Sequence, residues 1–284
     1  MKIQLATKIT INTIVINLIL SLFKLFAGLY AHSNAMISDA VHSASDVFSS
    51  FVVLIGIHFS HKESDRNHPY GHERFECVAA IVLAVILAIT GCTIGIKSIA
   101  PQTEIITPGI MALSAAAMSI LVKEAMYWYT RYYAVKLDSG ALMADAWHHR
   151  SDALSSIGAL IGVAGTRLGY PLCDAIASFI ICLFILKAAF DIFKDAIDKM
   201  IDKSCDEYTE QLIKEVILSH PEVLSIDFFQ TRLFANKIYI DLEISVDSNL
   251  TFKQAHECSE TIHNAIETQF PKVKHIMIHV NPSE

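Results

Sequence analysis

Charged residues are scarce in this sequence. Asp, Glu, Lys and Arg make up 18% of its 284 residues and hydrophobic residues make up 53%, while the mean hydropathy is +0.43. Soluble globular domains carry charge on about 25% of their residues. The composition therefore argues against a purely soluble protein and favours several membrane spans. The formal net charge of −7 gives no reason to expect binding to nucleic acid, which is itself polyanionic.

Signatures of disulfide, thiolate and hydrolase chemistry are also missing. The six cysteines form no C-x-x-C pair, which argues against a disulfide framework and a thiolate metal site. No H-E-x-x-H motif occurs, so a membrane metallohydrolase is a poor interpretation and we do not expect an enzyme. The N-terminal apolar stretch lacks the small-residue cleavage site of a signal peptide, so we interpret it as a retained span.

Six hydrophobic segments reach or exceed the roughly 20 residues that a helix needs to cross a bilayer. Residues 78–96 are the most apolar of them and contain no charged residue before Lys97. We place Lys123, Glu124 and Lys187 near segment ends, where long side chains can reach the membrane surface. The predicted spans are approximately residues 9–31, 36–60, 77–100, 108–133, 141–167 and 172–198.

Basic residues in the short connections predict the orientation of these spans. With the N-terminus inside, the outer connections hold little beyond Lys97 and Arg167. Both termini are therefore expected in the cytoplasm, with the protein in the inner (plasma) membrane of a bacterial type of cell. The inner segments hold Lys2, Lys8, Lys62, Arg66, Arg74, Arg131, Lys136, Lys194, Lys199 and Lys203.

The pattern changes after residue 203, where charged residues become frequent. Residues 206–220 and 251–270 have helical spacing, and residues 223–232, 238–246 and 272–280 read as strands. The order αββαβ predicts a ferredoxin-like α+β domain. We therefore expect a six-helix membrane domain at residues 1–203 and a cytoplasmic domain at residues 204–284.

Residues 39–56 and 145–162 repeat one pattern, with ten of eighteen positions identical. Each copy holds a histidine four residues before an aspartate: His42 and Asp46, then His148 and Asp152. This spacing places imidazole and carboxylate on one helix face. Three crossings separate the two spans, so they run antiparallel, and His148 is expected nearer Asp46. Ionisable groups in a span mark an ion pathway by default, and this set suits a tetrahedral divalent metal, zinc first.

Three ionisable residues near the repeated motif are further candidates for this metal site. His149 lies three residues before Asp152, although the duplicated register favours His148 as the ligand. Asp39 and Asp145 fall on or near the same helix faces. We interpret both as residues at the edge of the site, and the sequence does not decide whether any of the three assists it.

The connection after the second span holds a further candidate. Asp65, His68 and His72 offer one carboxylate and two imidazoles within a short glycine-containing stretch. Three such groups are enough to bind a metal that orders the loop. A solvated polar loop is the alternative interpretation.

The paired H-x-x-x-D motifs, the six spans, the segment from Asp65 to Glu76 and the αββαβ domain together resemble the cation diffusion facilitator family. The resemblance implies a homodimer in the lipid bilayer that exports a divalent metal in exchange for protons. It implies an accessory role for the metal bound by the inner loop. It also implies a cytoplasmic metal site, for which this chain retains His256 and His279 and has Asp227 and Asp241 where some members of the family carry histidine.

Zinc is the expected cargo and a possible regulatory ion, because nitrogen ligands suit it better than an all-oxygen shell would. Fe²⁺ or Co²⁺ accept similar ligands and remain alternative substrates, and Cd²⁺ is a plausible surrogate. An alternative function of another class is a membrane metal sensor, which binds metal ions without transporting them. It is less favoured, because sensing does not require ligands at the middle of a membrane.

Overall fold

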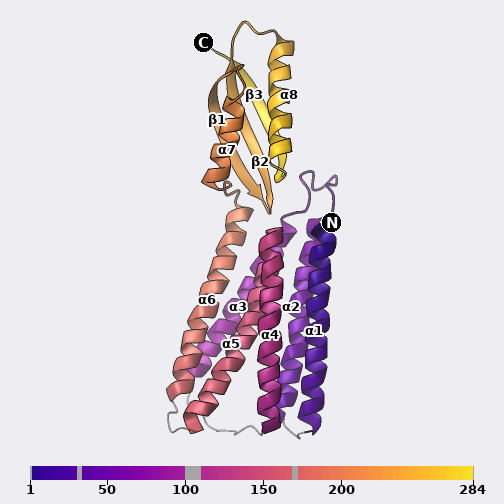
Figure 1. Cartoon of the computed structure of the whole chain (residues 1–284), viewed down its shortest axis with the longest axis vertical. Helices are drawn as coiled ribbons and strands as arrows, with labels where there is room; N and C mark the ends of the chain where they lie inside the picture. The colour runs from indigo at the N-terminus through magenta and orange to yellow at the C-terminus, as the bar shows by residue number, and fades with distance from the viewer. Residues whose placement is uncertain (1, 31–33, 100–109, 168–171, 284) are drawn as a thin grey trace. The chain divides into compact units, whose positions relative to one another are not determined.

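The computed structural model describes residues 2–30, 34–99, 110–167 and 172–283 (Figure 1). The chain divides into two compact units, Met1–Ile197 and Asp198–Glu284. The order of elements is the predicted one, six long helices followed by αββαβ. The six helices are α1 (Lys2–Tyr30), α2 (Asn34–Ser60), α3 (Phe75–Ile99), α4 (Ile110–Leu137), α5 (Gly140–Arg167) and α6 (Leu172–Met200).

The first unit has its polar residues inside and many of its large apolar residues outside. Phe26, Ile89 and Phe190 are each exposed over more than 60% of their surface, whereas Asn17 and Lys123 are buried. A soluble domain shows the opposite distribution, while a protein surrounded by lipid keeps ionisable groups in the bundle interior. Among the described residues, α1 and α3 are each long and apolar enough to cross a membrane, over Gln4–Phe26 and Phe75–Ile96.

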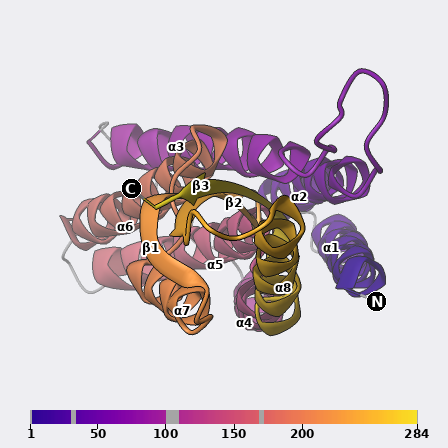
Figure 2. The same cartoon turned by 90° about the horizontal axis from the view of Figure 1, so that it is seen from above.

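Small residues let the helices of this unit approach one another closely. A side chain at Gly56 of α2 would collide with Ala79 of α3. One at Gly95 of α3 would lie 2.7 Å from Sγ of Cys182 in α6. Such small-residue contacts are the usual way in which membrane helices pack. α5 contacts α2, α3 and α4 (Figure 2). Asp145, Ala146, His148 and His149 are buried, so the start of the second copy of the duplicated motif lies in the interior of the bundle.

The second unit is a three-stranded sheet with two helices. Its elements are α7 (Glu207–Leu218), β1 (Val223–Phe234), β2 (Lys237–Val246), α8 (Phe252–Gln269) and β3 (Val273–Pro282). β2 is central, antiparallel to β1 and parallel to β3. Because parallel strands need a crossover, α8 connects β2 to β3. β1 extends two residues beyond the predicted end and turns at Ala235, whose φ is 55°.

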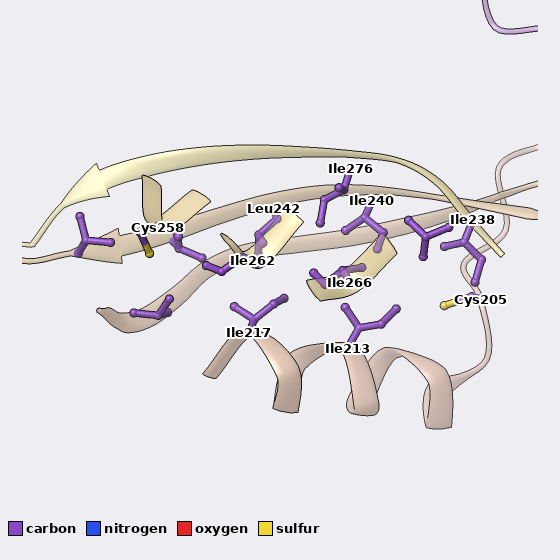
Figure 3. Packing of buried hydrophobic residues seen from close by; sticks show 14 residues of the cluster. Cys205, Ile213, Ile217, Ile238, Ile240, Leu242, Cys258, Ile262, Ile266 and Ile276 are labelled. Carbon is purple, nitrogen blue, oxygen red and sulfur yellow. The ribbon is translucent and has the colours of Figure 1, made fainter. Parts of the chain in front are cut away.

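The helices cover one face of the sheet through an isoleucine-rich core (Figure 3). Ile213 and Ile217 of α7 and Ile262 and Ile266 of α8 are fully buried against β2 residues such as Ile240. Both helices begin at capped ends. Asp206 accepts a hydrogen bond from the amide of Thr209, and Thr251 forms a capping box with Gln254. The opposite face of the sheet carries the polar residues of alternate strand positions.

Candidate metal centre

The duplicated motif brings together candidate ligands from α2 and α5. One oxygen or nitrogen atom of each of Asp46, His148 and Asp152 lies within 4.8 Å of the others. Nε2 of His148 is 3.7 Å from Oδ1 of Asp46, so the histidine of one copy faces the aspartate of the other. His42 lies one turn before Asp46 in α2, but its side chain falls outside the described part of the structure.

His148 is a buried imidazole whose ring nitrogens, within the described part of the chain, accept and donate no hydrogen bond. Its side chain is 6% exposed and that of Asp46 is 3% exposed. Unsatisfied buried polar atoms are rare in proteins, and each calls for an explanation. A role as a metal ligand would explain the unsatisfied His148 ring, because coordination uses the lone pair of one ring nitrogen.

Lys123 of α4 is a residue of this site that the sequence analysis missed. Its Nζ donates to Oδ2 of Asp46 at 2.6 Å and to Oδ2 of Asp152 at 2.8 Å. The expectation that Lys123 reaches the membrane surface is wrong, since its side chain is only 3% exposed. Lys123 lies near the middle of Ile110–Leu137. A lysine so far from both helix ends is the signal that could have identified it.

Asp145 and His149 form a second buried pair on α5. Both are fully buried, with Nε2 of His149 3.5 Å from Oδ2 of Asp145. Ser50 of α2 donates a hydrogen bond to the other oxygen of Asp145 at 3.1 Å. The structure thus places His149 beside Asp145, one turn away along the same helix. Asp39, the third residue that the sequence left open, has no described side chain.

The inner-loop candidates lie between α2 and α3, and their ligand atoms also gather within 4.8 Å. Nε2 of His72 is 3.5 Å from Oδ2 of Asp65, and the rings of His68 and His72 are 4.5 Å apart. Nδ1 of His72 lies 3.2 Å from each of the carbonyl oxygens of Lys62 and Glu63. Such a carbonyl contact fixes the ring and leaves Nε2 directed at the carboxylate.

Asp65 is held as a carboxylate in this loop. Lys62 donates to Oδ2 at 2.7 Å, and the backbone amides of His68 and Asn67 donate to Oδ1. These donors, Lys62 first, hold the pKa of Asp65 well below its usual range. Gly71, with φ of 100°, allows the chain to turn between the two histidines.

The candidates of the second unit are more dispersed. Register places Asp241 and His279 on the polar face of the sheet, beside Gln230 and Glu243 respectively. His256 belongs to α8 and stacks on Phe252 at 6.3 Å between ring centroids. Within the described residues, no three acidic, histidine or cysteine ligands of this unit lie within 4.8 Å of one another. One protomer by itself therefore does not assemble these residues into a compact metal site.

Asp227 already has three donors on the polar face. Ser225 and Ser245 donate through their hydroxyls at 2.7 and 2.6 Å, and Asn281 through its amide at 3.1 Å. These hydrogen bonds, that from Ser245 first, lower the pKa of Asp227. Asn281 also donates to Glu243 at 3.3 Å. Asp227 is therefore part of a polar network across all three strands.

Comparison with known proteins covers nearly the whole chain. Residues 10–201 match a family model described as the cation efflux transmembrane domain. Residues 205–283 match one described as the cytoplasmic domain of cation efflux proteins. The first match ends at residue 201 and the second begins at residue 205, close to the boundary between the two units.

Three of the relatives align over 90% or more of both chains. An uncharacterized transporter of Methanocaldococcus jannaschii is 34% identical over 95% of this chain and 96% of its own. The manganese efflux system protein MneP of Bacillus subtilis is 34% identical over 98% and 97%. The magnetosome protein MamB of Paramagnetospirillum magneticum is 28% identical over 93% and 90%. A solved structure of the MamM CTD carrying one substitution, in a nickel form, covers 28% of this chain and 100% of its own, at 24% identity and a TM-score of 0.27.

Proposed function

The chain belongs to the cation efflux, or cation diffusion facilitator, family of membrane transporters, and we propose that it exports zinc from the cytoplasm in exchange for protons. Efflux of a divalent metal is the function of the family. The observation that supports a transport site in this chain is the cluster of Asp46, His148 and Asp152 on two antiparallel helices. Asp46 and His148 are buried in it. We include His42 as the fourth ligand from the duplicated register.

The ligand set supports zinc as the cargo. An imidazole nitrogen is a better ligand for zinc than for manganese or magnesium, which prefer oxygen. The two carboxylates neutralise the charge of a divalent ion, which lowers the cost of placing it in a low-dielectric interior. Fe²⁺ and Co²⁺ accept the same donors and are alternative cargoes.

Manganese is a second candidate that a specific observation favours. MneP, a manganese efflux system protein, aligns with 98% of this chain at 34% identity. Transport by purified protein in liposomes, measured with matched concentrations of Zn²⁺, Mn²⁺, Fe²⁺, Co²⁺ and Cd²⁺, separates the candidates. Zinc as cargo predicts the highest kcat/KM for Zn²⁺, and a higher value for Mn²⁺ contradicts it.

Exchange for protons follows from the chemistry of the ligands. A metal binds the neutral imidazole and the ionised carboxylate, so its binding displaces any proton on these groups. Protons arriving from the other side can in turn displace the metal. In proteoliposomes, zinc movement should follow an imposed pH gradient and stop when an ionophore removes it. Undiminished movement without the gradient would contradict proton exchange.

Substitution of Asp152 tests the site itself. Asp152→Ala removes one carboxylate ligand and should abolish zinc flux, whereas Asp191→Asn, which changes an exposed carboxylate of α6, should leave it unchanged. A wild-type rate in Asp152→Ala would refute the site. Wild-type protein that binds zinc without moving it would identify a membrane metal sensor instead.

We further propose a homodimer in the plasma membrane, with both termini in the cytoplasm. Residues 205–283 match the family's cytoplasmic domain, which supports a cytoplasmic C-terminus. In this arrangement Asp65, His68 and His72 hold an accessory metal on the cytoplasmic side. Asp227, Asp241, His256 and His279 contribute to regulatory metal binding in the dimer. Equilibrium sedimentation in detergent, with and without zinc, tests the dimer and its dependence on the metal.

A further inference from the structure

Lys123 places a cation between the two carboxylates of the proposed transport site. Its Nζ is 2.6 Å from Oδ2 of Asp46 and 2.8 Å from Oδ2 of Asp152. The three residues come from α4, α2 and α5, so a third helix contributes directly to the site. Neither copy of the duplicated motif contains this lysine.

The lysine and a divalent ion cannot use these oxygens at the same time. Zinc binds carboxylate oxygens at about 2.0–2.2 Å, so an ion bound to both Oδ2 atoms would overlap the ammonium group. An ion bound through the Oδ1 atoms would avoid the overlap but would still lie close to a like charge. That repulsion is strong in an interior of low dielectric constant.

Two buried carboxylates also need a partner when no metal is bound. An uncompensated charge is costly in a protein interior. Lys123 supplies one positive charge, and its ammonium donates to both carboxylates. Its four-carbon side chain is flexible and can withdraw by rotation of its own bonds.

We propose that Lys123 is an intramolecular competitor of the transported metal. Its ammonium pairs with Asp46 and Asp152 before the ion arrives, leaves them when the ion binds and returns to them as the ion departs. This inference rests on the proposed transport function. It has two consequences. Lys123 weakens the apparent affinity, because only molecules with the lysine withdrawn can bind. It also speeds release, because its return replaces the metal as partner of the carboxylates.

Zinc binding by the full-length protein tests the competition. Isothermal titration in nanodiscs at one fixed pH compares Lys123→Gln, Lys123→Arg and the parent, all carrying Asp65→Asn to weaken the inner-loop candidate. Lys123→Gln should lower the apparent Kd by roughly tenfold or more, since the bound fraction is no longer limited by the lysine. Lys123→Arg should raise the Kd, because a guanidinium holds carboxylates through two parallel hydrogen bonds.

Lys136→Gln is the matched control. It makes the same chemical change on the same helix at an exposed lysine, whose ammonium lies 5.9 Å from the centre of the Tyr132 ring. Its Kd should equal that of the parent. In proteoliposomes at saturating zinc, Lys123→Gln should slow turnover while Lys136→Gln should not, because release without the competing ammonium is slower.

An unchanged or higher Kd in folded Lys123→Gln would overturn the proposal. If that variant does not fold, Lys123→Arg decides, and an unchanged Kd there overturns it equally. The outcome is separable from the transport function. Absence of zinc flux in the wild type would reject transport, whereas flux in the wild type with equal Kd values in all variants would reject competition alone.

Discussion

Two lysine–aspartate contacts of nearly equal length lie in opposite surroundings in this protein. Lys123 donates to Asp46 at 2.6 Å with both side chains 3% exposed. Lys62 donates to Asp65 at 2.7 Å with side chains 56% and 34% exposed. Each aspartate lies beside a histidine, so both sites have the same kinds of donor. The two sites differ in whether water can solvate the aspartate and the lysine after their contact breaks.

Burial makes the first contact costly to disrupt and the second inexpensive. At Asp65, water replaces the lysine and salt screens the charge, as for most surface ion pairs. At Asp46, loss of a partner leaves a charge without solvent. The inner-loop residues can therefore bind or lose a metal with little consequence for the fold. Under our proposal, the membrane site instead exchanges one cation for another, so that neither carboxylate is left without a partner.

The largest effect is expected from Asp46→Asn. The substitution removes a metal ligand and leaves Lys123 with one carboxylate, so zinc transport should fall by about a hundredfold or more, beyond the usual effect of outer-shell partners. The matched change in the exposed loop, Asp65→Asn, should retain most of the rate. Zinc flux into proteoliposomes measures both. Equal losses in the two variants would remove the distinction between the sites.

Zinc should also stabilise the fold mainly through the buried site. At a hundred times its Kd, a ligand specific for the folded state stabilises it by about 2.7 kcal/mol. Thermal unfolding should show this stabilisation in the wild type and in Asp65→Asn. In Asp152→Asn it should be largely absent. Stabilisation that disappears in Asp65→Asn instead would assign the tighter binding to the loop.

A smaller effect is expected where a buried carboxylate has no lysine in contact. Asp145 contacts Ser50 and His149, so Asp145→Asn weakens the contact with His149 and keeps a hydrogen-bonding side chain of the same shape. The expected loss is about 1 kcal/mol in unfolding free energy, with zinc affinity within a few-fold of the wild type. Chemical denaturation and titration with zinc measure the two quantities. A loss of zinc binding as large as that of Asp46→Asn would add Asp145 to the ligands.

The smallest effect concerns the pH dependence of the loop. Because the folded-state pKa of Asp65 is below its ordinary value of 3.8, this carboxylate contributes stability above pH 3.8 and loses it as the pH falls through the folded-state pKa. Lys62→Gln should raise that pKa, which makes the contribution at pH 7 smaller and narrows the pH range over which it is lost. Carbon-13 chemical shifts of labelled aspartate follow the titration. A pKa unchanged by Lys62→Gln would show that the backbone amides of His68 and Asn67 suffice.

The sequence predicted the elements well because their signals are local. The alternation of isoleucines in β2 and the amphipathic spacing of α8 each depend on neighbouring residues, and both elements are present. The membrane segments were predicted shorter than the helices are. α1 begins at Lys2 and not near residue 9, since a helix continues past the end of its apolar stretch while its hydrogen bonds can still form.

The site could be predicted in part from symmetry. The duplicated motif and the antiparallel direction of the two spans predicted that His148 lies near Asp46, and Nε2 of His148 is 3.7 Å from Oδ1 of Asp46. The pairing of His149 with Asp145 could have been found from their separation of four residues, the reverse of the repeated motif. Lys123 could not be assigned in this way, because no local pattern connects α4 to carboxylates on α2 and α5.

The sequence by itself determined the six helices, the αββαβ order and the helix faces that carry histidine and aspartate, because each depends on periodicity along one segment. Only the tertiary structure decided which charges meet. That decision depends on how α2, α4 and α5 are rotated and packed against one another, which is set by many weak contacts between distant parts of the chain. The cation in contact with Asp46 and Asp152 is therefore a property of the packed bundle and not of either motif.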